Sequence, residues 1–234
     1  MRNNAQERVD KEIADWEYMK NLPQTLQGYY YRDDHTIIDD VYNLFSYVND
    51  EFHCSLTIFY HEETREYKLS QKIGMIEFCC IECIAADLHE FELLLKERME
   101  DILYGMIHFD PKTVSLLVRQ TGITEWDYHP YLPNECEGFT LFIHPDEPVK
   151  ITNGSYIVCD YENFKLNSDL VIYYNMYRDE FYVDSRANDA PVINYEFDSY
   201  SLAELQSNIE KYLKSTLQSI RETAEKRCTD DQHK

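Results

Sequence analysis

Three cysteines, Cys79, Cys80 and Cys83, form the densest group of side chains that could do chemistry. The C-x-x-C spacing is typical of zinc sites and of redox-active dithiols. We expect a strand over residues 76–83, however, and residues three apart on a strand point to opposite faces of the sheet. The strand therefore favours buried structural thiols, in which cysteine acts as a small hydrophobic residue. The seven cysteines of the chain lack a framework-like spacing, so we expect them to be reduced.

The histidines show no ligand spacing such as H-E-x-x-H. His53 precedes Cys54, but neighbours on an extended segment point apart, whereas nucleophilic catalysis needs ring and sulfur to converge. The acidic runs 33–35 and 39–40 contain oxygen ligands for Mg²⁺ or Ca²⁺ without the pattern of a calcium loop. Glycine-rich phosphate loops and the G-x-S-x-G elbow are also absent from the sequence. The sequence thus predicts no catalytic residue, no cofactor, no metal and a non-enzymatic protein.

Charge and composition narrow the function classes further. The 234 residues contain 44 Asp and Glu against 22 Lys and Arg, for a net charge of -22. This balance excludes the usual nucleic-acid-binding surface, because neutralising phosphates requires clustered Lys and Arg. A chain with 14% aromatic and 44% apolar residues also differs from a disordered acidic tail and can bury a sizeable core.

Tyrosines next to carboxylates are the strongest indication of a binding surface. Tyrosine suits protein interfaces, since it buries area and keeps a polar tip, and a negative field speeds encounter with a basic partner. We expect a protein that neutralises a basic protein partner, as an immunity or antitoxin-type inhibitor of a bacterial toxin would. The expected partner-binding residues are Tyr30, Tyr31, Asp33, Asp34, Glu62, Glu63, Tyr177, Asp179 and Glu180.

Three alternatives stay open beside simple solubility conferred by the charge. The protein could be a DNA mimic or phage anti-defence inhibitor, with carboxylates spaced like duplex phosphates. It could be an enzyme with a site between two halves of the chain, for which the candidates are Asp33, His35, His53 and Cys54. It could also be a structural subunit or adaptor that uses its long last helix. Direct nucleic-acid or membrane binding is not expected.

The elements that position these residues occur twice. The motif at residues 15–18, with Trp16, recurs at 125–128 with Trp126, and Gly28 recurs at Gly138, both at an offset of 110. Further on, the alternating apolar residues at 56, 58 and 60 recur at 170, 172 and 174, at an offset of 114. This periodicity predicts one duplicated module, with copies over residues 1–110 and 111–230 and a polar tail over 228–234.

Each copy is predicted as an α+β unit: a helix, an antiparallel meander of three or four strands, and a closing helix. In the first copy we expect strands over 29–32, 56–60 and 76–83, with a hairpin turn at 62–65. In the second copy we expect the corresponding strands over 139–143, 170–174, 181–183 and 192–197. The closing helices begin at N-caps Asp87 and Ser201, each with a glutamate three positions later. Residues 37–48 are helical in pattern, although the corresponding 155–161 are extended.

The cellular compartment is predicted from the polar start of the sequence and from the length of its apolar segments. Polar residues open the chain, and no apolar segment reaches the ~20 residues of a membrane span. We therefore expect a cytoplasmic protein.

Overall fold

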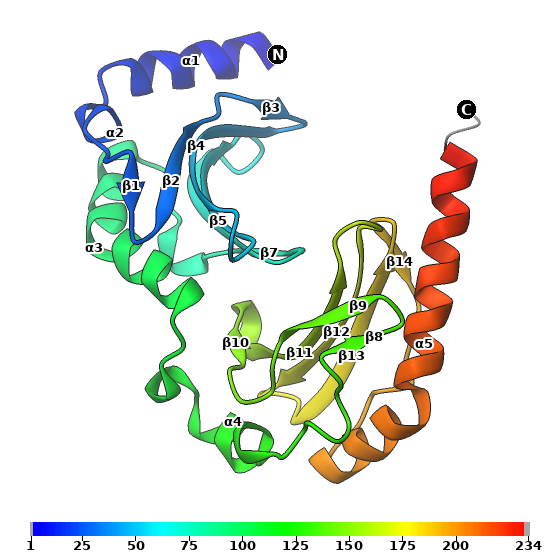
Figure 1. The fold of residues 1–234 in the computed structure, drawn as a ribbon. Helices are drawn as coiled ribbons and strands as arrows, with labels where there is room; N and C mark the ends of the chain where they lie inside the picture. Colours follow the sequence, from blue (N-terminus) through cyan, green and yellow to red (C-terminus); the bar gives the residue numbers. More distant parts are fainter. Residues whose placement is uncertain (1, 232–234) are drawn as a thin grey trace. The chain divides into compact units, whose positions relative to one another are not determined.

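The computed structural model describes residues 2–231. The chain divides into two compact units, Met1–Phe109 and Asp110–Lys234. Each unit is α+β and is built on one seven-stranded antiparallel sheet (Figure 1).

The first unit begins with a helical segment, continues through its sheet and closes with a long helix. Its elements are α1 (Arg2–Ala14), α2 (Glu17–Lys20), β1 (Thr25–Leu26), β2 (Tyr29–Asp33), β3 (Ile37–Ile38), β4 (Val41–Asn49), β5 (Cys54–His61), β6 (Glu66–Ile73), β7 (Ile76–Cys79), the 3₁₀ helix η1 (Ile81–Cys83) and α3 (Leu88–Ile107). The strand order is β1-β2-β4-β5-β6-β7, with β3 paired to β4 outside this path.

The second unit repeats this order of elements, with short helical pieces at its start. They are η2 (Pro111–Thr113), α4 (Leu116–Gln120), η3 (Ile123–Glu125), β8 (Glu135–Cys136), β9 (Phe139–Ile143), β10 (Val149–Lys150), η4 (Thr152–Gly154), β11 (Ser155–Asn163), β12 (Ser168–Asn175), β13 (Glu180–Ala187), β14 (Ala190–Val192) and α5 (Leu202–Asp231). The strand order is β14-β13-β12-β11-β9-β8, with β10 paired to β11 outside this path.

The α+β class and the antiparallel pairing were predicted correctly, but the strand count was too low. We expected three or four strands per unit, and each sheet has seven. Several of the additional strands, such as β1, β3, β8 and β10, are only two residues long. A strand that short carries no alternation of apolar and polar residues from which it could be recognised.

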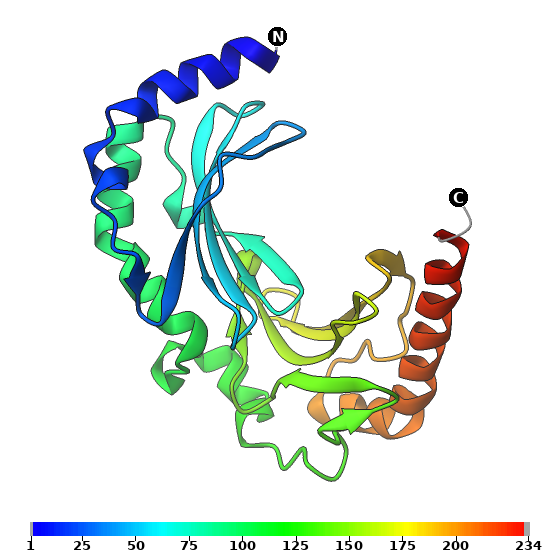
Figure 2. The same ribbon diagram turned by 45° about the horizontal axis from the view of Figure 1, so that its top comes forward.

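The closing helices cover one face of each sheet. In Figure 2, α3 runs along one face of the first sheet, and its residues contact β5 and β6. Along β5, buried and half-buried residues alternate strictly, so one face of the strand packs into the core. In the second unit α5 contacts β12 and β13 in the same way. The buried stripes of the two helices are Leu88, Phe91, Leu95, Met99 and Leu103 in α3, and Leu205, Ile209, Leu213, Leu217, Ile220 and Ala224 in α5.

Both predicted N-caps are present. The Asp87 carboxylate accepts hydrogen bonds from the backbone N–H groups of His89 and Glu90, at 2.9 and 3.0 Å. The Ser201 hydroxyl accepts one from the N–H of Glu204 at 3.2 Å. These bonds satisfy N–H groups that a helix cannot pair internally, which fixes where each closing helix begins.

The helical pattern of residues 37–48 conflicted with the extended pattern of residues 155–161, and the structure shows that the helical interpretation is the wrong one. Residues 37–48 form β3 and β4, and β4 corresponds to the extended β11. The register of β4 against β5 shifts between Asn43 and Phe45, which marks a β-bulge. The bulge, together with burial on both faces, places Leu44, Phe45, Ser46 and Tyr47 in the interior. The apolar spacing then resembles that of a helix, because a central strand buried on both faces loses its alternation.

The start of the second unit also differs from the prediction. We expected one helix at this start, but Asp110 caps a short 3₁₀ helix, and its carboxylate accepts a hydrogen bond from the N–H of Lys112 at 2.9 Å. A new α-helix, α4, then begins after Ser115, and Gly122 in the left-handed region (φ +80°) ends the segment. At the other end, α5 reaches Asp231, so residues 228–231 of the expected tail are helical, and 232–234 lie outside the described residues.

Equivalent hydrogen bonds hold the first β-hairpin of each unit to its sheet. The Tyr47 hydroxyl donates to the carbonyl of Pro23 at 2.8 Å, and the Tyr161 hydroxyl donates to that of Pro133 at 2.7 Å. In the same places, the side-chain amides of Asn49 and Asn163 donate to the carbonyls of glycines 28 and 138, at 3.1 and 2.9 Å. The chain segments at Leu22-Pro23 and Leu132-Pro133, just before the hairpins, are thus fixed by contacts that match in both units.

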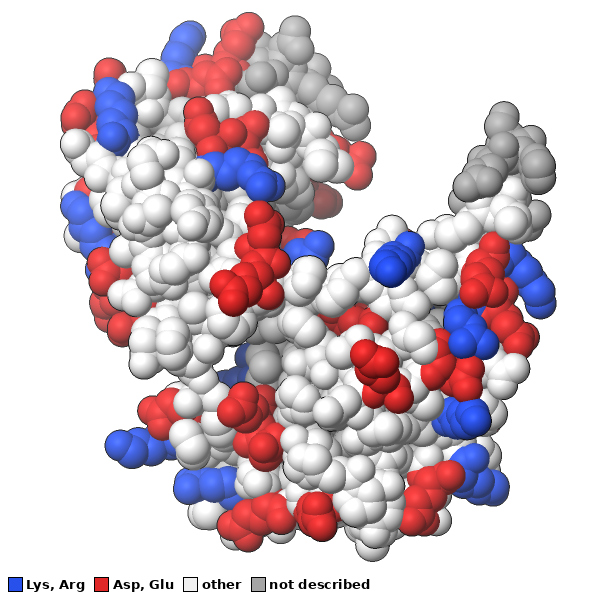
Figure 3. Space-filling model, viewed as in Figure 1, with Lys and Arg blue, Asp and Glu red and all other residues white. Residues whose placement is uncertain are grey.

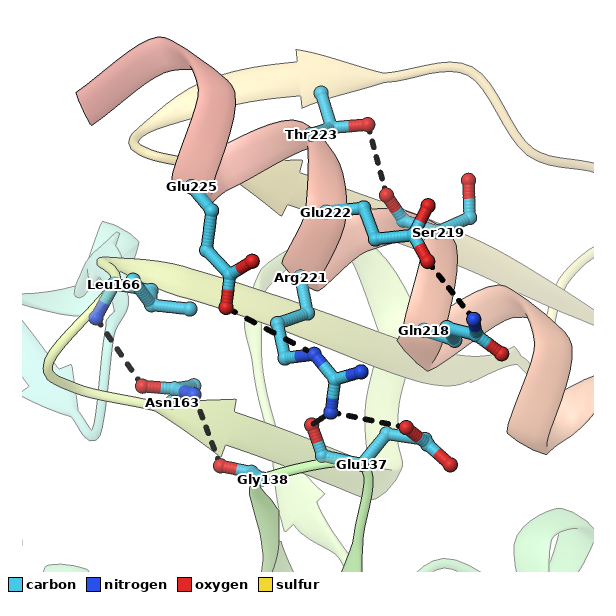
Figure 4. A network of polar contacts seen from close by, with 10 residues as sticks. All are labelled: Glu137, Gly138, Asn163, Leu166, Gln218, Ser219, Arg221, Glu222, Thr223 and Glu225. Atoms are coloured by element: carbon cyan, nitrogen blue, oxygen red, sulfur yellow. Dashed lines mark hydrogen bonds and ion pairs between the residues drawn. The ribbon is translucent and has the colours of Figure 1, made fainter. Parts of the chain in front are cut away.

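The second unit adds a clamp from α5 (Figure 4). Arg221 donates to both the main-chain and a side-chain oxygen of Glu137, at 3.0 and 2.9 Å. Glu137 and Gly138 form the β8–β9 turn, both at positive φ, and Asn163 holds this turn from the other side. Because one guanidinium nitrogen of Arg221 reaches both the main chain and the carboxylate of Glu137, the contact ties the edge hairpin to the helix.

Candidate partner-binding surfaces

The predicted surface residues on β2 lie on two different faces of the strand. Tyr30 is 67% exposed, whereas Tyr31 is half-buried and stacks on the buried ring of Phe45 at 5.6 Å. Burial, followed by the nearby charges of Asp33 and Asp34, raises the pKa of Tyr31 to about 12. Strand alternation thus separates Tyr30 from Tyr31 and Asp33, which the sequence had grouped together.

Asp33 and His35 belong to a chain of four polar side chains. Asp33 Oδ1 lies 2.9 Å from Nε2 of His35, and Nδ1 of His35 lies 3.1 Å from the Tyr42 hydroxyl. That hydroxyl donates to Asp10 Oδ1 at 2.5 Å, which links β4 to α1. Burial, then the bond to Asp10, raises the pKa of Tyr42, so Tyr42 remains a neutral donor at physiological pH.

This polar chain borders a small hollow in the first unit. The hollow has a volume of about 340 Å³, and its lining includes Ile13, Met19, Lys20, Tyr31, Asp33 and His35. A cavity of this size lies at the lower end of the range for small-molecule sites, and its wall carries both signs of charge. The sequence-based candidates Asp33 and His35 are therefore neighbours at one concave surface.

Other carboxylates lie at the same end of the first unit, along α1. The hydroxyl of Tyr67 donates to Glu12 Oε2 at 2.8 Å. Glu62, in the β5–β6 turn, lies 3.5 Å from Arg8, which also contacts the Tyr60 ring. Glu63 is exposed in the same turn. Tyrosine hydroxyls thus hold α1 carboxylates in place, while Arg8 neutralises part of the charge of the turn.

The β12–β13 turn of the second unit carries the remaining predicted residues. Tyr177 is 76% exposed, yet its ring lies against Gly154, where an added Cβ would come within 2.4 Å of the ring. The Asn175 side chain accepts from the N–H groups of Tyr177 and Arg178, both at 3.0 Å. These contacts hold an exposed aromatic ring in one position.

Two carboxylates, Asp179 and Glu180, follow Tyr177 in the chain. Asp179 accepts a hydrogen bond from the Tyr174 hydroxyl at 2.7 Å, and Glu180 lies 2.7 Å from Arg178. We call the exposed ring and its acidic neighbours, Tyr177, Asp179 and Glu180, the turn anchor. It occupies the same place in the second sheet as Glu62 and Glu63 occupy in the first.

The acidic side chains are distributed over both units. Figure 3 shows Asp and Glu groups on each unit, with Lys and Arg set among them along α5. Many charges of the helices are paired locally, as in the contact of Lys96 with Glu92 over one helical turn, at 2.5 Å. The carboxylates that stand beside tyrosines come from α1 as well as from the turns, as in the contacts of Asp10 with Tyr42 and of Asp179 with Tyr174.

Sequence reasoning missed a cluster of buried acids in the second unit. Asp160, Glu162 and Asp169 are at most 1% exposed and lie on adjacent strands, with Glu162 directly opposite Asp169. Arg186 on β13 binds Asp169 with a bidentate contact. Burial, followed by the charge and hydrogen bond of Glu162, raises the pKa of Asp160 well above its usual range. Asp160 and Glu162 lie two positions apart on β11, but the cross-strand register that sets Glu162 opposite Asp169 is not revealed by any sequence pattern.

A groove also lies between the chain after β14 and α5. Its volume is about 560 Å³, and Ile193, Tyr195, Thr216 and Ile220 are part of its lining. Ile193 is 82% and Tyr195 73% exposed, although we expected residues 192–197 to continue as a strand with a buried face. The strand ends at Val192. Of the alternate residues Ile193, Tyr195 and Phe197, which a strand would have buried together, Phe197 alone is in the core.

The other candidates for catalysis do not converge. Cys54 is buried and its thiol donates to the carbonyl of Phe52 at 3.2 Å, while His53 is exposed in a left-handed turn conformation. Within the described part of the chain, no three His, Cys, Asp or Glu side chains are grouped to hold a metal ion. Over the same residues, no helix has the length and apolar composition to cross a membrane.

Comparison with known proteins gives no further assignment. No protein-family model, no curated protein and no solved structure matches the chain.

Proposed function

We propose that the protein is a non-enzymatic binding protein that captures a basic protein partner. The turn anchor is the observation that carries this proposal. An exposed Tyr177, already held against Gly154, loses little conformational freedom on binding. Asp179 and Glu180 beside it offer charge-assisted hydrogen bonds to arginine or lysine of a partner.

The net charge of -22 supports the same proposal. A strongly acidic surface raises the rate at which a basic protein arrives, and the arriving cations then compete for carboxylates such as Glu63 and Glu180. An immunity or antitoxin-type inhibitor of a bacterial toxin is the type of protein that works in this way. Its carboxylates would occupy the cationic cleft of the toxin.

An arginine-rich peptide is a suitable probe, because it presents the chemistry of the partner without requiring its identity. Binding measured by calorimetry should weaken at least tenfold from ~0.05 to ~0.5 M salt. Tyr177→Ala should weaken binding at both salt concentrations, because it removes an uncharged anchor. Tyr200→Ala is the matched control, since Tyr200 is exposed to the same degree, at 75%, but lies outside the turn anchor. Equal affinities for both variants would contradict the proposal.

A DNA mimic remains the alternative within the same class. Its partner would be a DNA-binding protein and would be released by duplex DNA of any sequence. A partner of an immunity-type inhibitor would remain bound under the same competition.

The chain of Asp33, His35, Tyr42 and Asp10 beside the hollow favours a second candidate, an enzyme. Asp33 and His35 are two of the four residues we had named for it. His35→Ala separates the two functions, because it removes the centre of the chain and should leave binding of the basic peptide unchanged.

We also propose that the two units are diverged copies of one ancestral module. Their sheets share one strand order, and matched residues make the same bonds, as Tyr47 and Tyr161 do with the carbonyls of Pro23 and Pro133. Each unit also has one isolated β-bridge at the equivalent place. Tyr67 pairs with Ala85 in the first unit, and Phe181 pairs with Ser199 in the second, at an offset of 114. Such agreement in side-chain bonds is more specific than a shared fold class.

A further inference from the structure

Cys80 and Cys83 lie on a tight turn that the sequence did not predict. The strand β7 ends at Cys79, and η1 follows over Ile81–Cys83 with Cys80 as its N-terminal cap. The N–H of Cys83 donates to the carbonyl of Cys80 at 3.0 Å and closes the turn. A turn of this kind holds its first and fourth Cα atoms within ~7 Å, and a disulfide spans ~4.4–6.8 Å between Cα atoms. The backbone is thus already close to the geometry of a disulfide, although both cysteines are free.

The two sulfur atoms differ in protonation. The Cys83 thiol donates a hydrogen bond to the Cys80 sulfur, which together with the backbone N–H groups of Glu82 and Cys83 lowers the pKa of Cys80 to about 7. Burial and the negative charge of Glu82 oppose this shift without cancelling it. The same hydrogen bond, followed by burial, raises the pKa of Cys83. At neutral pH a substantial fraction of Cys80 is therefore the nucleophilic thiolate, with a proton held on Cys83.

Access and charge around the pair are also unequal. Cys80 is half-buried and keeps part of its surface open to solvent, whereas Cys83 is fully buried. Arg98 extends from α3, binds Glu82 and acts on Cys83 with its positive charge. Its Nε–H is buried and has no acceptor among the described residues. A negative charge that forms on Cys83 would thus be stabilised by a neighbouring cation.

The second unit shows what the fold itself requires here. Cys83 corresponds to Phe197, which is equally buried, so an apolar residue suffices at that position. Cys80 corresponds to Asn194, and neither a thiol nor a thiolate is needed there. Burial in the core accounts for one cysteine and leaves the half-buried thiol and its hydrogen bonds unexplained.

We propose that Cys80 and Cys83 form a redox-active dithiol that exchanges with small-molecule disulfides such as glutathione disulfide. The Cys80 thiolate attacks one sulfur of glutathione disulfide, which breaks its S–S bond, forms a mixed disulfide and releases one glutathione thiolate. Cys83 then gives up its proton and attacks the Cys80 sulfur, which forms the Cys80–Cys83 disulfide and releases the second glutathione. Two protein thiols are oxidised, and one glutathione disulfide is reduced to two glutathione molecules.

The test is to equilibrate the full chain without oxygen in glutathione buffers of increasing oxidised fraction. The mixtures are quenched in acid, alkylated and analysed by mass spectrometry, and circular dichroism checks the fold at each ratio. We expect a disulfide between Cys80 and Cys83 to become the dominant species as the oxidised fraction rises. The rate of iodoacetamide alkylation of Cys80 should reach half its maximum near pH 7.

Variants identify which thiols take part. Cys79→Ser should form the same disulfide, since Cys79 lies outside the turn, whereas Cys80→Ser should form none. Cys83→Ala should accumulate the mixed disulfide of Cys80 with glutathione, which shows the first step alone. The proposal is overturned if folded wild-type protein keeps Cys80 reduced, carries only the mixed disulfide, or forms its disulfide through Cys79.

Discussion

The indole Nε1 of Trp16 donates a hydrogen bond of 2.7 Å to Oε2 of Glu92, which joins the start of the first unit to its closing helix. In the second unit, Trp126 Nε1 donates to Oε1 of Gln206 at 3.2 Å. Both bonds connect the tryptophan motif to the fifth residue of a closing helix, Glu92 in α3 and Gln206 in α5. The motif is therefore a structural feature that joins the first and last elements of each unit.

The two tryptophans differ in burial, and their truncation should differ in cost. Trp16 is 4% exposed and packs against Phe45, whereas Trp126 is half-buried and stacks on Tyr131. Trp16→Ala should reduce the free energy of unfolding by ~3–5 kcal/mol, and Trp126→Ala by less. Urea denaturation of both variants measures the difference. Unchanged stability of Trp16→Ala would show that the residue is not structural.

The tyrosine bonds to the proline carbonyls offer a matched pair of mutations. Tyr47→Phe and Tyr161→Phe each remove a single hydroxyl from a buried ring and leave the carbonyl of Pro23 or Pro133 without that donor. We expect each to cost ~1–3 kcal/mol in the free energy of unfolding. If the units are equivalent copies, the two losses should be similar. A loss in one unit alone would argue against the equivalence of these bonds.

The buried carboxyl of Asp160 predicts a pH dependence of stability. Burial, then the charge and hydrogen bond of Glu162, raises its pKa in the folded chain above the unfolded value. Its contribution to stability is therefore fully present below the unfolded pKa of ~3.9 and is lost as the pH rises through the folded pKa. Asp160→Asn cannot ionise and should be more stable than the wild type at pH 8 by ~1–3 kcal/mol.

Thermal unfolding of Asp160→Asn and wild type, measured from pH 4 to pH 8, tests this sign. The advantage of the variant should grow with pH. Asp184→Asn is the control, because Asp184 lies on β13 of the same sheet, with β12 between it and the strand of Asp160, and is exposed. An advantage that is constant across the pH range would contradict an elevated pKa for Asp160.

The elements that the sequence predicted best are those with a local signal. Asp87 and Ser201 mark helix starts through their own backbone contacts, and strict alternation identifies β5. The prediction failed where tertiary structure overrides the local pattern. The bulge at Asn43–Phe45 disrupts the alternation of β4, and the strand expected through Cys83 ends at Cys79.

The candidate surfaces were predictable only in part. Adjacency in sequence correctly indicated that Asp33 and His35 are neighbours. It could not indicate that Gly154 supports the Tyr177 ring, or that strand register sets Glu162 opposite Asp169. Both relationships depend on pairings between segments that one sequence does not specify.

The central claim is that the acidic surface and its tyrosine anchor capture a basic partner. Its most direct test is the affinity of the wild type, Tyr177→Ala and the control Tyr200→Ala for an arginine-rich peptide, each measured at low and at ~0.5 M salt. The account predicts that the wild type and the control lose at least tenfold in affinity with salt, and that Tyr177→Ala binds more weakly at both concentrations. An affinity that does not change with salt, or that is the same for Tyr177→Ala as for the wild type, would contradict it.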